Sequence, residues 1–149
     1  MILFIGIQAS GKSSFYREFF SQGYEQVSLD ILHTRNKERI KMEQCLEQGI
    51  GFVVDNTNPT QEDRKKYIAA ARQYGYRVVG YYFQSCVGEC MERNERREGK
   101  AKVSRCAVAA TFRKLELPDY REGFDLLYYV AMEKGGWRVE NWEEDRDEV

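Results

Sequence analysis

The stretch "FIGIQASGKSSF" at residues 4–15 joins an apolar run to two glycines, a lysine and several small hydroxylated residues. Its central part, residues 6–13, fits GxxxxGK[ST], the pattern of a loop that cradles nucleotide phosphates. With ordinary glycine usage, the four fixed positions match by chance in roughly half a percent of chains of this length. The surroundings also fit, because residues 1–5 are apolar enough for a buried strand and a helical pattern starts at Lys12.

Each fixed position of this loop has a physical role. Glycines let the backbone fold so that successive N–H groups point at a phosphate, and the N-terminus of the following helix favours negative charge. The lysine reaches the β- and γ-phosphates, and the hydroxyl of Ser13 ligates magnesium. We therefore predict binding of ATP and Mg²⁺ by residues of this stretch, namely Gly6, Gln8, Ala9, Ser10, Gly11, Lys12, Ser13 and Ser14.

Apolar strand patterns alternate with helical patterns along the rest of the chain. This alternation predicts an α/β fold of three layers, a mostly parallel sheet covered by helices on both faces, in a single domain over residues 1–149. An acidic tail at about 143–149 is expected to be frayed. The predicted strands are residues 1–5, 23–30, 51–55 and 76–83, and the predicted helices are residues 12–21, 34–48, 60–74, 87–97 and 104–114. After Pro118 the pattern weakens, and residues 124–132 and 137–142 are candidates for short strands of a sheet that is expected to have five strands.

Two aspartates follow predicted strands directly. In an open parallel sheet, reacting groups gather at the carboxyl ends of the strands, and Asp30 and Asp55 are each expected there. Asp30 is placed to accept the proton of an attacking hydroxyl, as kinases require. Asp55 is placed either to hold magnesium through water or to position an acceptor. The alternative for each aspartate is a helix cap or a turn.

A basic run, interrupted by Gly99, occupies the segment after the fourth strand. It includes Arg93 and Arg97, which are four residues apart and are therefore expected on one helix face. One interpretation is a solvated helix face. The other is a small helical lid at about 93–106 that closes over the transferring phosphoryl group and supplies cations to it.

Composition narrows the range of partners. The 149 residues are 42% hydrophobic and carry a formal charge of −1, so no overall field favours nucleic acid or an anionic membrane. No apolar run approaches the roughly 20 residues of a membrane span, and a cytoplasmic location without membrane contact is expected. A GTPase is disfavoured because no NKxD segment is present. "RNKER" at residues 35–39 lacks the aspartate.

Several of these features together resemble the 5′-kinase module of polynucleotide kinases. They are the loop, "VSLD" ending at Asp30, "DNTNP" beginning at Asp55 and the RNxxR of residues 93–97, and the resemblance covers residues 1–124. It implies an adenylate-kinase-like core of five parallel strands.

The resemblance also implies roles for individual residues. Lys12 and Ser13 hold ATP phosphates and magnesium, and Asp30 is the general base that activates the 5′-hydroxyl of DNA or RNA. The lid arginines Arg97 and Arg93 face the donor. Residues of the acceptor side are Asp55, Asn56 and Asn58 of "DNTNP", with His33 at a position where some members carry an arginine for an acceptor phosphate.

Two other functions remain open at this stage. A small-molecule kinase that acts on metabolites such as sugar acids is built from the same loop, base and lid. A nucleotide-binding regulatory protein or slow ATPase needs the loop but no hydroxyl acceptor. The sequence therefore predicts a nucleoside triphosphate donor, and the acceptor is either a nucleic-acid 5′-end or a small-molecule hydroxyl.

Overall fold

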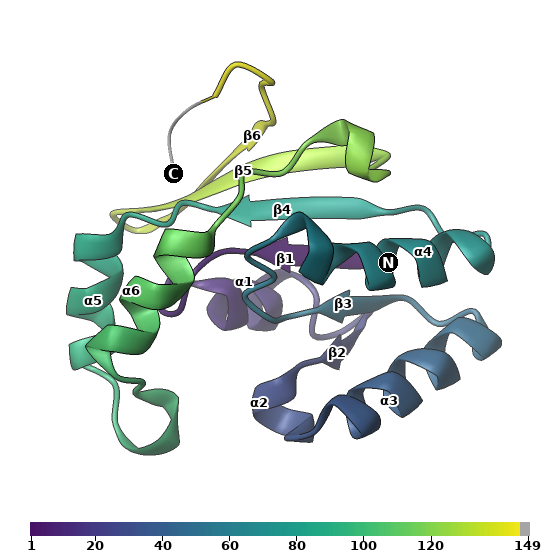
Figure 1. Ribbon diagram of the computed structural model, residues 1–149, viewed down its shortest axis with the longest axis horizontal. Coiled ribbons are helices and arrows are strands. Elements are labelled where there is room, and N and C mark those ends of the chain that lie inside the picture. Colours follow the sequence, from purple (N-terminus) through teal and green to yellow (C-terminus); the bar gives the residue numbers. More distant parts are fainter. Residues whose placement is uncertain (147–149) are drawn as a thin grey trace.

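Within residues 1–146, which the computed structural model describes, a six-stranded sheet runs through the molecule in the order β2-β3-β1-β4-β5-β6 (Figure 1). The first five strands are parallel, as predicted, and β6 pairs with β5 in an antiparallel hairpin. The resemblance implied five strands, so the hairpin adds one. The strands are β1 (Ile2–Ile5), β2 (Glu25–Val27), β3 (Phe52–Val54), β4 (Val79–Phe83), β5 (Leu126–Glu133) and β6 (Gly136–Asn141).

Helices follow the strands in the predicted alternation. At the start of α4 the Thr60 side chain accepts from the Asp63 N–H, and the Asp63 carboxylate accepts from the Thr60 N–H, which together form a capping box. The helices are α1 (Lys12–Phe19), α2 (Leu29–Leu32), α3 (Arg35–Gln48), α4 (Gln61–Gln73), α5 (Val87–Glu95) and α6 (Arg105–Lys114), with short 3-10 turns η1 (Gly99–Ala101) and η2 (Tyr120–Glu122).

Two predicted boundaries were wrong in ways that affect the site. The second strand ends at Val27, three residues before Asp30, and Asp30 lies instead in the one-turn helix α2. The fifth helix ends at Glu95, so Arg97 lies in the loop beyond it and does not share a helix face with Arg93. The backbone of Arg96 and Arg97 turns back onto α5 through bonds to the carbonyls of Arg93 and Asn94.

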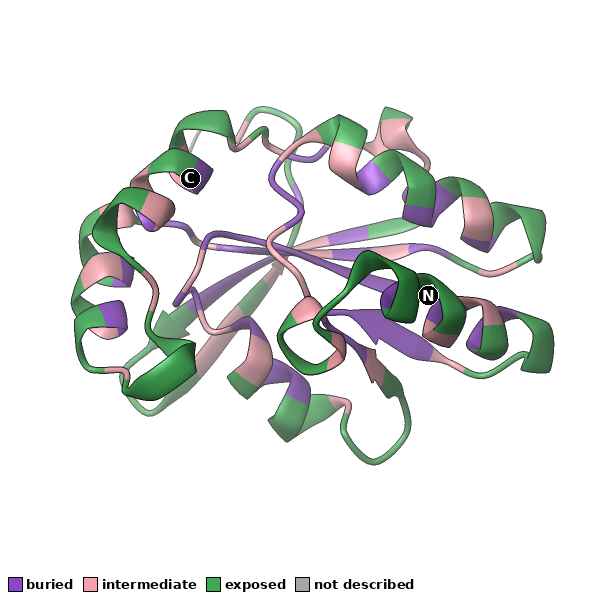
Figure 2. Cartoon of the chain, turned by 60° about the horizontal axis from the view of Figure 1, so that its bottom comes forward, coloured by how far each residue is buried: buried purple, intermediate pink, exposed green. Residues whose placement is uncertain are grey.

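The core lies on both faces of the sheet because successive residues of a strand point to opposite faces. In β1, Leu3 and Ile5 pack in the cluster that contains residues of α3 and α4, while Ile2 and Phe4 pack with Phe15 of α1 on the other face. Figure 2 shows the buried strands at the centre and the exposed outer faces of the helices. The continuous apolar run of β1 thus reflects burial on two sides.

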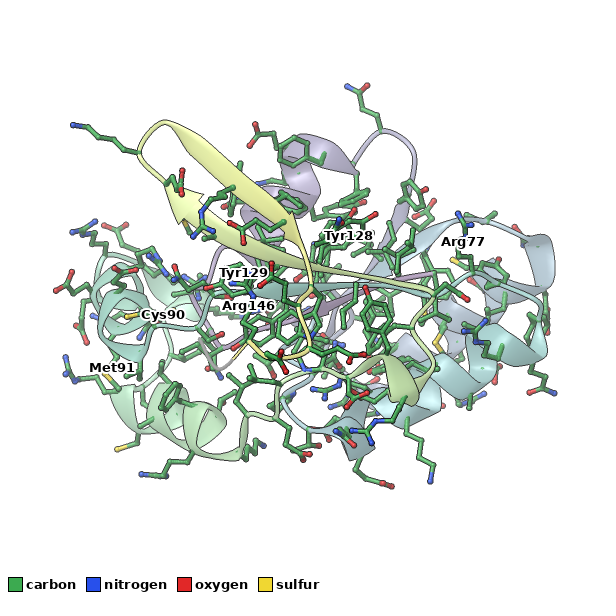
Figure 3. The ribbon with its side chains drawn as sticks, turned by 90° about the horizontal axis from the view of Figure 1, so that it is seen from above. Arg77, Cys90, Met91, Tyr128, Tyr129 and Arg146 are labelled. Carbon is green, nitrogen blue, oxygen red and sulfur yellow. The ribbon has the colours of Figure 1, made fainter. Side chains whose placement is uncertain are left out.

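The residues after β6 pack against the sheet as far as they are described. The Arg146 guanidinium lies 3.9 Å from the Tyr129 ring centroid, and an ion pair of 2.7 Å joins it to Glu140 (Figure 3). Within the tail, the Arg146 N–H donates to the Glu143 carbonyl at 3.1 Å and closes a turn. That the tail frays stays a prediction. Residues 147–149 lie outside the described part of the chain.

The helices of residues 1–146 are each too short or too polar to cross a membrane.

Candidate phosphoryl-transfer site

The predicted phosphate loop connects β1 to α1 and is fixed from several sides. The Gly6 N–H donates to the Thr57 carbonyl at 3.0 Å, and a Cβ at Gly6 would lie 2.7 Å from Ser10 Oγ. Gly11 has φ of +101°, and a Cβ there would lie 2.7 Å from the Met132 side chain and 2.8 Å from Trp137. Glycine at position 11 is therefore required by the left-handed backbone. At Gly6 close approach favours glycine, because a Cβ would also lie 3.0 Å from Phe83 Cβ and 3.2 Å from the Phe83 carbonyl oxygen.

The N-terminus of α1 has the properties of an anion site. Its N-cap is Gly11, so no side chain caps the helix, and the first turn contains no acidic residue. The N–H groups of this turn have no partner four residues earlier in the helix. Together with the helix dipole, they favour a negatively charged ligand such as a phosphate.

The Lys12 ammonium lies inside the loop. It donates to the carbonyl oxygens of Gly6 at 2.9 Å and Ile7 at 2.8 Å, and the residue is only 8% exposed. Burial lowers the pKa of Lys12 to about 8, against the opposing effect of the nearby Asp55 carboxylate. It also donates to Ser10 Oγ at 3.4 Å. A poorly solvated cation whose partners are uncharged groups of the loop is suited to exchange them for a phosphate.

Ser13 and Asp55 form an oxygen pair beside the loop. The Ser13 hydroxyl donates to Asp55 Oδ2 at 2.9 Å, and the Gln26 amide donates to the same oxygen at 2.8 Å. Asp55 is 4% exposed and immediately follows β3. Hydroxyl and carboxylate oxygens are the ligands that Mg²⁺ prefers, so this pair fits a magnesium ion that also binds phosphates and water.

One cavity of about 320 Å³ joins most of the predicted residues. Of the predicted set, it is lined by Gln8, Ala9, Lys12, Ser13, Asp30, Asp55, Asn56, Asn58 and Arg97. The predicted residues Gly6, Ser10, Gly11, Ser14, His33 and Arg93 are outside its lining. The cavity therefore brings together four segments that can be located in Figure 1: the phosphate loop, the end of β3, helix α2 and the segment after α5.

Asp30 reaches the cavity from α2, which is fastened to the loop after β3. The Leu29 N–H, at the start of α2, donates to Asn56 Oδ1 at 2.9 Å. Asp30 itself is exposed, and no other side chain of residues 1–146 is found hydrogen-bonded to its carboxylate. Its oxygens are therefore accessible to an acceptor hydroxyl.

The two arginines of the predicted lid, residues 93–106, occupy different positions. Arg93 Nε donates to the Ala9 carbonyl at 2.7 Å, so it braces the outside of the phosphate loop. Arg97 lines the cavity, and its Nη1 donates to the Ala101 carbonyl at 3.1 Å within the lid loop. The Gln8 amide also donates to Thr111 of α6 at 3.0 Å. The phosphate loop is thus tied to α5 and α6, the two helices that flank the segment predicted to be a lid.

The amides of "DNTNP" serve the architecture of the site. Asn58, with φ of +44°, donates through Nδ2 to the Phe4 carbonyl at 2.8 Å. Asn56 donates to Glu38 Oε2 at 2.7 Å in addition to holding α2. Both line the cavity, so their predicted role on the acceptor side stays a prediction. The amide nitrogens of both residues are bonded to the protein and help to fix the loop.

Four charged residues of the cavity lining were not predicted as site residues. They are Arg35, Asp63, Lys100 and Lys114. Lys100 falls within the basic run that indicated the lid, so the sequence carried a signal for it. Arg35 follows Asp30 by five residues, and Asp63 and Lys114 lie near helix ends that only the fold brings together.

The chain matches known families over most of its length. The family model described as "AAA domain" (AAA_33) matches residues 1–118. The bifunctional polynucleotide phosphatase/kinase of Schizosaccharomyces pombe is 29% identical over 128 residues, which cover 83% of this chain and 31% of that protein. A putative bifunctional polynucleotide phosphatase/kinase of Acanthamoeba polyphaga mimivirus is 30% identical over 138 residues, 88% of this chain and 33% of that protein. The chain spans about a third of the length of these relatives.

Solved structures share the fold. Kti12 of Chaetomium thermophilum, in complex with ADP-AlF3, superposes with a TM-score of 0.69 at 17% identity, over 87% of this chain and 88% of that one. A sugar kinase of Janibacter sp. HTCC2649 superposes with a TM-score of 0.63 at 14% identity, over 86% of this chain and 83% of that one. The relatives confirm the resemblance to polynucleotide kinases, and the structures confirm the P-loop fold. Because the family model covers well over half of the sequence, the chain belongs to the AAA domain family, as a domain of the P-loop nucleotide-binding fold.

Proposed function

We propose that this domain is an ATP- and Mg²⁺-dependent phosphotransferase that moves the γ-phosphoryl group to a hydroxyl, with the 5′-hydroxyl end of a DNA or RNA strand as acceptor. The proposal rests on one observation, namely that Lys12 and Asp30 line the same cavity. A binding or regulatory domain needs the phosphate loop alone. An accessible carboxylate facing that loop is what transfer to a hydroxyl requires in addition.

The reaction forms a bond between the acceptor oxygen and the γ-phosphorus and breaks the bond from that phosphorus to the β–γ bridging oxygen. Asp30 accepts the proton of the acceptor hydroxyl, and ADP leaves. Lys12 and Arg97 stabilise the negative charge on the phosphoryl oxygens from two sides of the cavity. Ser13 and Asp55 would hold Mg²⁺, which when bound neutralises charge on the β- and γ-phosphates.

The acceptor is proposed from two observations. The curated relatives are named as polynucleotide phosphatase/kinases, at about 30% identity. In addition, the cavity concentrates cations although the chain as a whole has a charge of −1. A local set of cations suits a short contact with the end of a strand better than a long nucleic-acid footprint, which needs one basic partner per phosphate.

Replacement of Asp30 by asparagine tests the proposal. We expect transfer of labelled phosphate from ATP to a 5′-hydroxyl oligonucleotide to fall about a hundredfold, since a positioned base contributes at least that much. Asp145→Asn is the matched control, because Asp145 is exposed and outside the cavity, and it should retain full activity.

The same assay separates the proposal from the other functions. A panel of metabolites and a reaction with water alone are run alongside the oligonucleotide. Label found only on a metabolite would show that the acceptor is a small molecule and not a polynucleotide. Release of inorganic phosphate alone, at a rate that Asp30→Asn does not change, would contradict phosphoryl transfer to a hydroxyl.

Replacement of Arg97 by alanine tests the role of the lid loop. Because its guanidinium is proposed to contact charge that develops during transfer, we expect kcat to fall tenfold or more while the Kd for ATP changes little. Lys102→Ala is the control, since Lys102 lies in the same loop outside the cavity lining and pairs with Glu95. A larger effect on ATP affinity than on kcat would instead make Arg97 a simple binding contact.

A further inference from the structure

The β5–β6 hairpin carries two large side chains to the phosphate loop. Because β1, β4 and β5 are parallel, the turn after Glu133 lies at the edge of the sheet where β1 passes into the loop (Figure 1). Met132 lies directly opposite Trp137 in the antiparallel pair, so their side chains share one face of the sheet. It is the face that α1 covers, because Trp137 packs against the cluster that contains Phe15.

Both side chains contact the backbone at Gly11, the N-cap of α1. The space that a side chain of residue 11 would occupy is filled by Met132 Cε, at 2.7 Å from a Cβ built there, and by Trp137 Cη2, at 2.8 Å. Gly11 has a left-handed backbone and directly precedes Lys12, the first residue of the helix. The hairpin therefore contacts the chain at the point where the phosphate loop becomes a helix.

Trp137 is fixed to α1 at two further positions. Its Nε1 donates to Glu18 Oε2 at 2.8 Å, and its ring meets the Phe15 ring edge-on at a centroid distance of 5.1 Å. Positions 11, 15 and 18 are spaced by four and three residues, so they lie on one face of the helix. One indole thus spans α1 from its N-cap to its last turn.

This contact bears on phosphate binding because the end of α1 lacks other constraints. No side chain caps the helix, and the N–H groups of its first turn have no partner within it. They bind a phosphate well only when they point at it together. Order that exists before the ligand arrives reduces the conformational entropy that binding costs. A rigid side chain packed against the N-cap can therefore raise the affinity for a phosphate without contacting it.

The hairpin acts from outside the site that has been described. Met132, Trp137 and Gly11 do not belong to the lining of the cavity. The family model ends at residue 118, whereas β5 begins at Leu126 and β6 at Gly136. The support of the phosphate loop by this hairpin is therefore a feature of the chain beyond the part that the family model matches.

We propose that Trp137 is a positioning residue for phosphate binding, which acts through Gly11 and Glu18 to hold the N-terminus of α1 in the arrangement that receives the nucleotide phosphates. This inference rests on the nucleotide-binding part of the proposed function and requires no particular acceptor. Its ligand is the diphosphate group of the nucleotide, irrespective of the base.

Calorimetric titration of the whole chain with ADP and Mg²⁺, and separately with inorganic pyrophosphate and Mg²⁺, tests the inference without turnover. We expect Trp137→Leu to raise the Kd of both ligands about tenfold, because the backbone at Gly11 must then be ordered when the ligand binds. Trp137→Phe should lie between this variant and the wild type, since it keeps a ring beside Phe15 but loses the bond to Glu18.

Trp142→Leu is the matched control, at a temperature where all variants are folded. Trp142 directly follows β6 and is 7% exposed, but its ring packs against Tyr82 at 5.4 Å in the cluster on the other face of the sheet. Its replacement should destabilise the protein and leave both dissociation constants unchanged. An equal loss of binding in Trp137→Leu and Trp142→Leu would reduce the effect to general stability and overturn the inference.

Fluorescence gives a second measurement that a purely structural role would not affect. The chain contains two tryptophans, so Trp142→Phe leaves Trp137 as the only indole. In this variant, pyrophosphate with Mg²⁺ should change the emission saturably, with the Kd that calorimetry gives, because the indole contacts Gly11. In Trp137→Phe, where Trp142 is the reporter, the emission should stay constant.

Three results would overturn the inference. They are unchanged binding in Trp137→Leu, constant emission of Trp137 at saturation, and a wild-type protein that does not bind pyrophosphate. A loss confined to ADP would also overturn it, because the indole would then serve the nucleoside and not the phosphate loop.

The labelled-ATP assay keeps these results separate from the proposed function. A protein that phosphorylates oligonucleotides but binds both ligands equally well with and without Trp137 contradicts the inference alone. A protein whose pyrophosphate binding depends on Trp137 but which transfers phosphate to no hydroxyl supports the inference and contradicts the kinase.

Discussion

Replacement of Lys12 by methionine is expected to lower phosphoryl transfer about a thousandfold while leaving the nucleotide-free protein at least as stable as the wild type. The loss of activity follows from the proposed role, because the ammonium stabilises charge on the transferred phosphoryl group and methionine has no charge. Methionine has a similar length and an apolar body, so it fills the same buried space inside the loop.

The expected stability of the Lys12→Met variant follows from the burial of the Lys12 charge in the wild-type protein. The folded state lowers the pKa of Lys12 from 10.5 to about 8, mainly through desolvation. Below pH 8 burial of the cation therefore lowers the free energy of unfolding of the wild-type protein by its full amount, on the order of 3 kcal/mol. This figure does not include the loop carbonyls that lose a partner in the Lys12→Met variant. Between about pH 8 and 10.5 the unfolded chain binds more protons than the folded one, so this cost decreases as the pH rises.

Urea denaturation of both proteins, without nucleotide and with a chelator, measures this difference. We expect the Lys12→Met variant to equal or exceed the wild type in free energy of unfolding at pH 7, and the gap to narrow as the pH is raised from 8 towards 10.5. A variant that is clearly less stable at pH 7 would show that the ammonium stabilises the loop. Unchanged transfer activity would contradict the role of the phosphate loop itself.

Much of the phosphate-loop side of the site could be predicted because residues close together in the sequence specify it. Eight consecutive positions between an apolar strand and a helix specify the phosphate loop, and strand alternation places it at the end of β1. Asp55 was placed correctly for the same reason, since it follows a short, fully buried strand. Periodicity could not show that the chain leaves β2 at Val27 and turns into α2.

The proposed acceptor side of the site depends on contacts between distant parts of the chain. Glu38 and Tyr67 are separated by 29 residues, and each is unremarkable within its own helix. In the sequence, a glutamate in the first turn of α3 is typical of a solvated residue whose negative charge interacts favourably with the helix dipole. Only the packing of α3 against α4 buries it beside a tyrosine and makes it an anchor for Arg35.

The largest effect on stability is expected from replacement of Arg64 by alanine. Arg64 is wholly buried, and its guanidinium donates to both carboxylate oxygens of Glu122, at 2.8 and 3.0 Å. It also donates to the carbonyls of Asn58 at 3.0 Å and Glu116 at 3.1 Å. Removal of the cation leaves a largely buried carboxylate and backbone carbonyls without their partner, which costs about 3–5 kcal/mol.

Denaturation in urea gives the size of this effect, and Arg72→Ala provides the comparison on the same helix. Arg72 pairs with Asp125 at 3.1 Å, but both side chains are substantially exposed, so its removal should cost about 1 kcal/mol or less. Arg64→Lys should lie between the two, since an ammonium keeps the charge but cannot reach all of these acceptors. A loss below about 1 kcal/mol for Arg64→Ala would contradict this account of the pair.

Replacement of Arg64 should also affect catalysis, because its guanidinium joins α4 to the loop that follows β3. Two of the carbonyls that Arg64 holds, those of Asn58 and Pro59, belong to residues that line the cavity, and Asn58 in turn donates to the Phe4 carbonyl of β1. At a temperature where Arg64→Lys is still folded, we therefore expect phosphoryl transfer to fall by more than the small unfolded fraction explains, with the Kd for ATP nearly unchanged. Full activity in the folded variant would show that the pair serves stability alone.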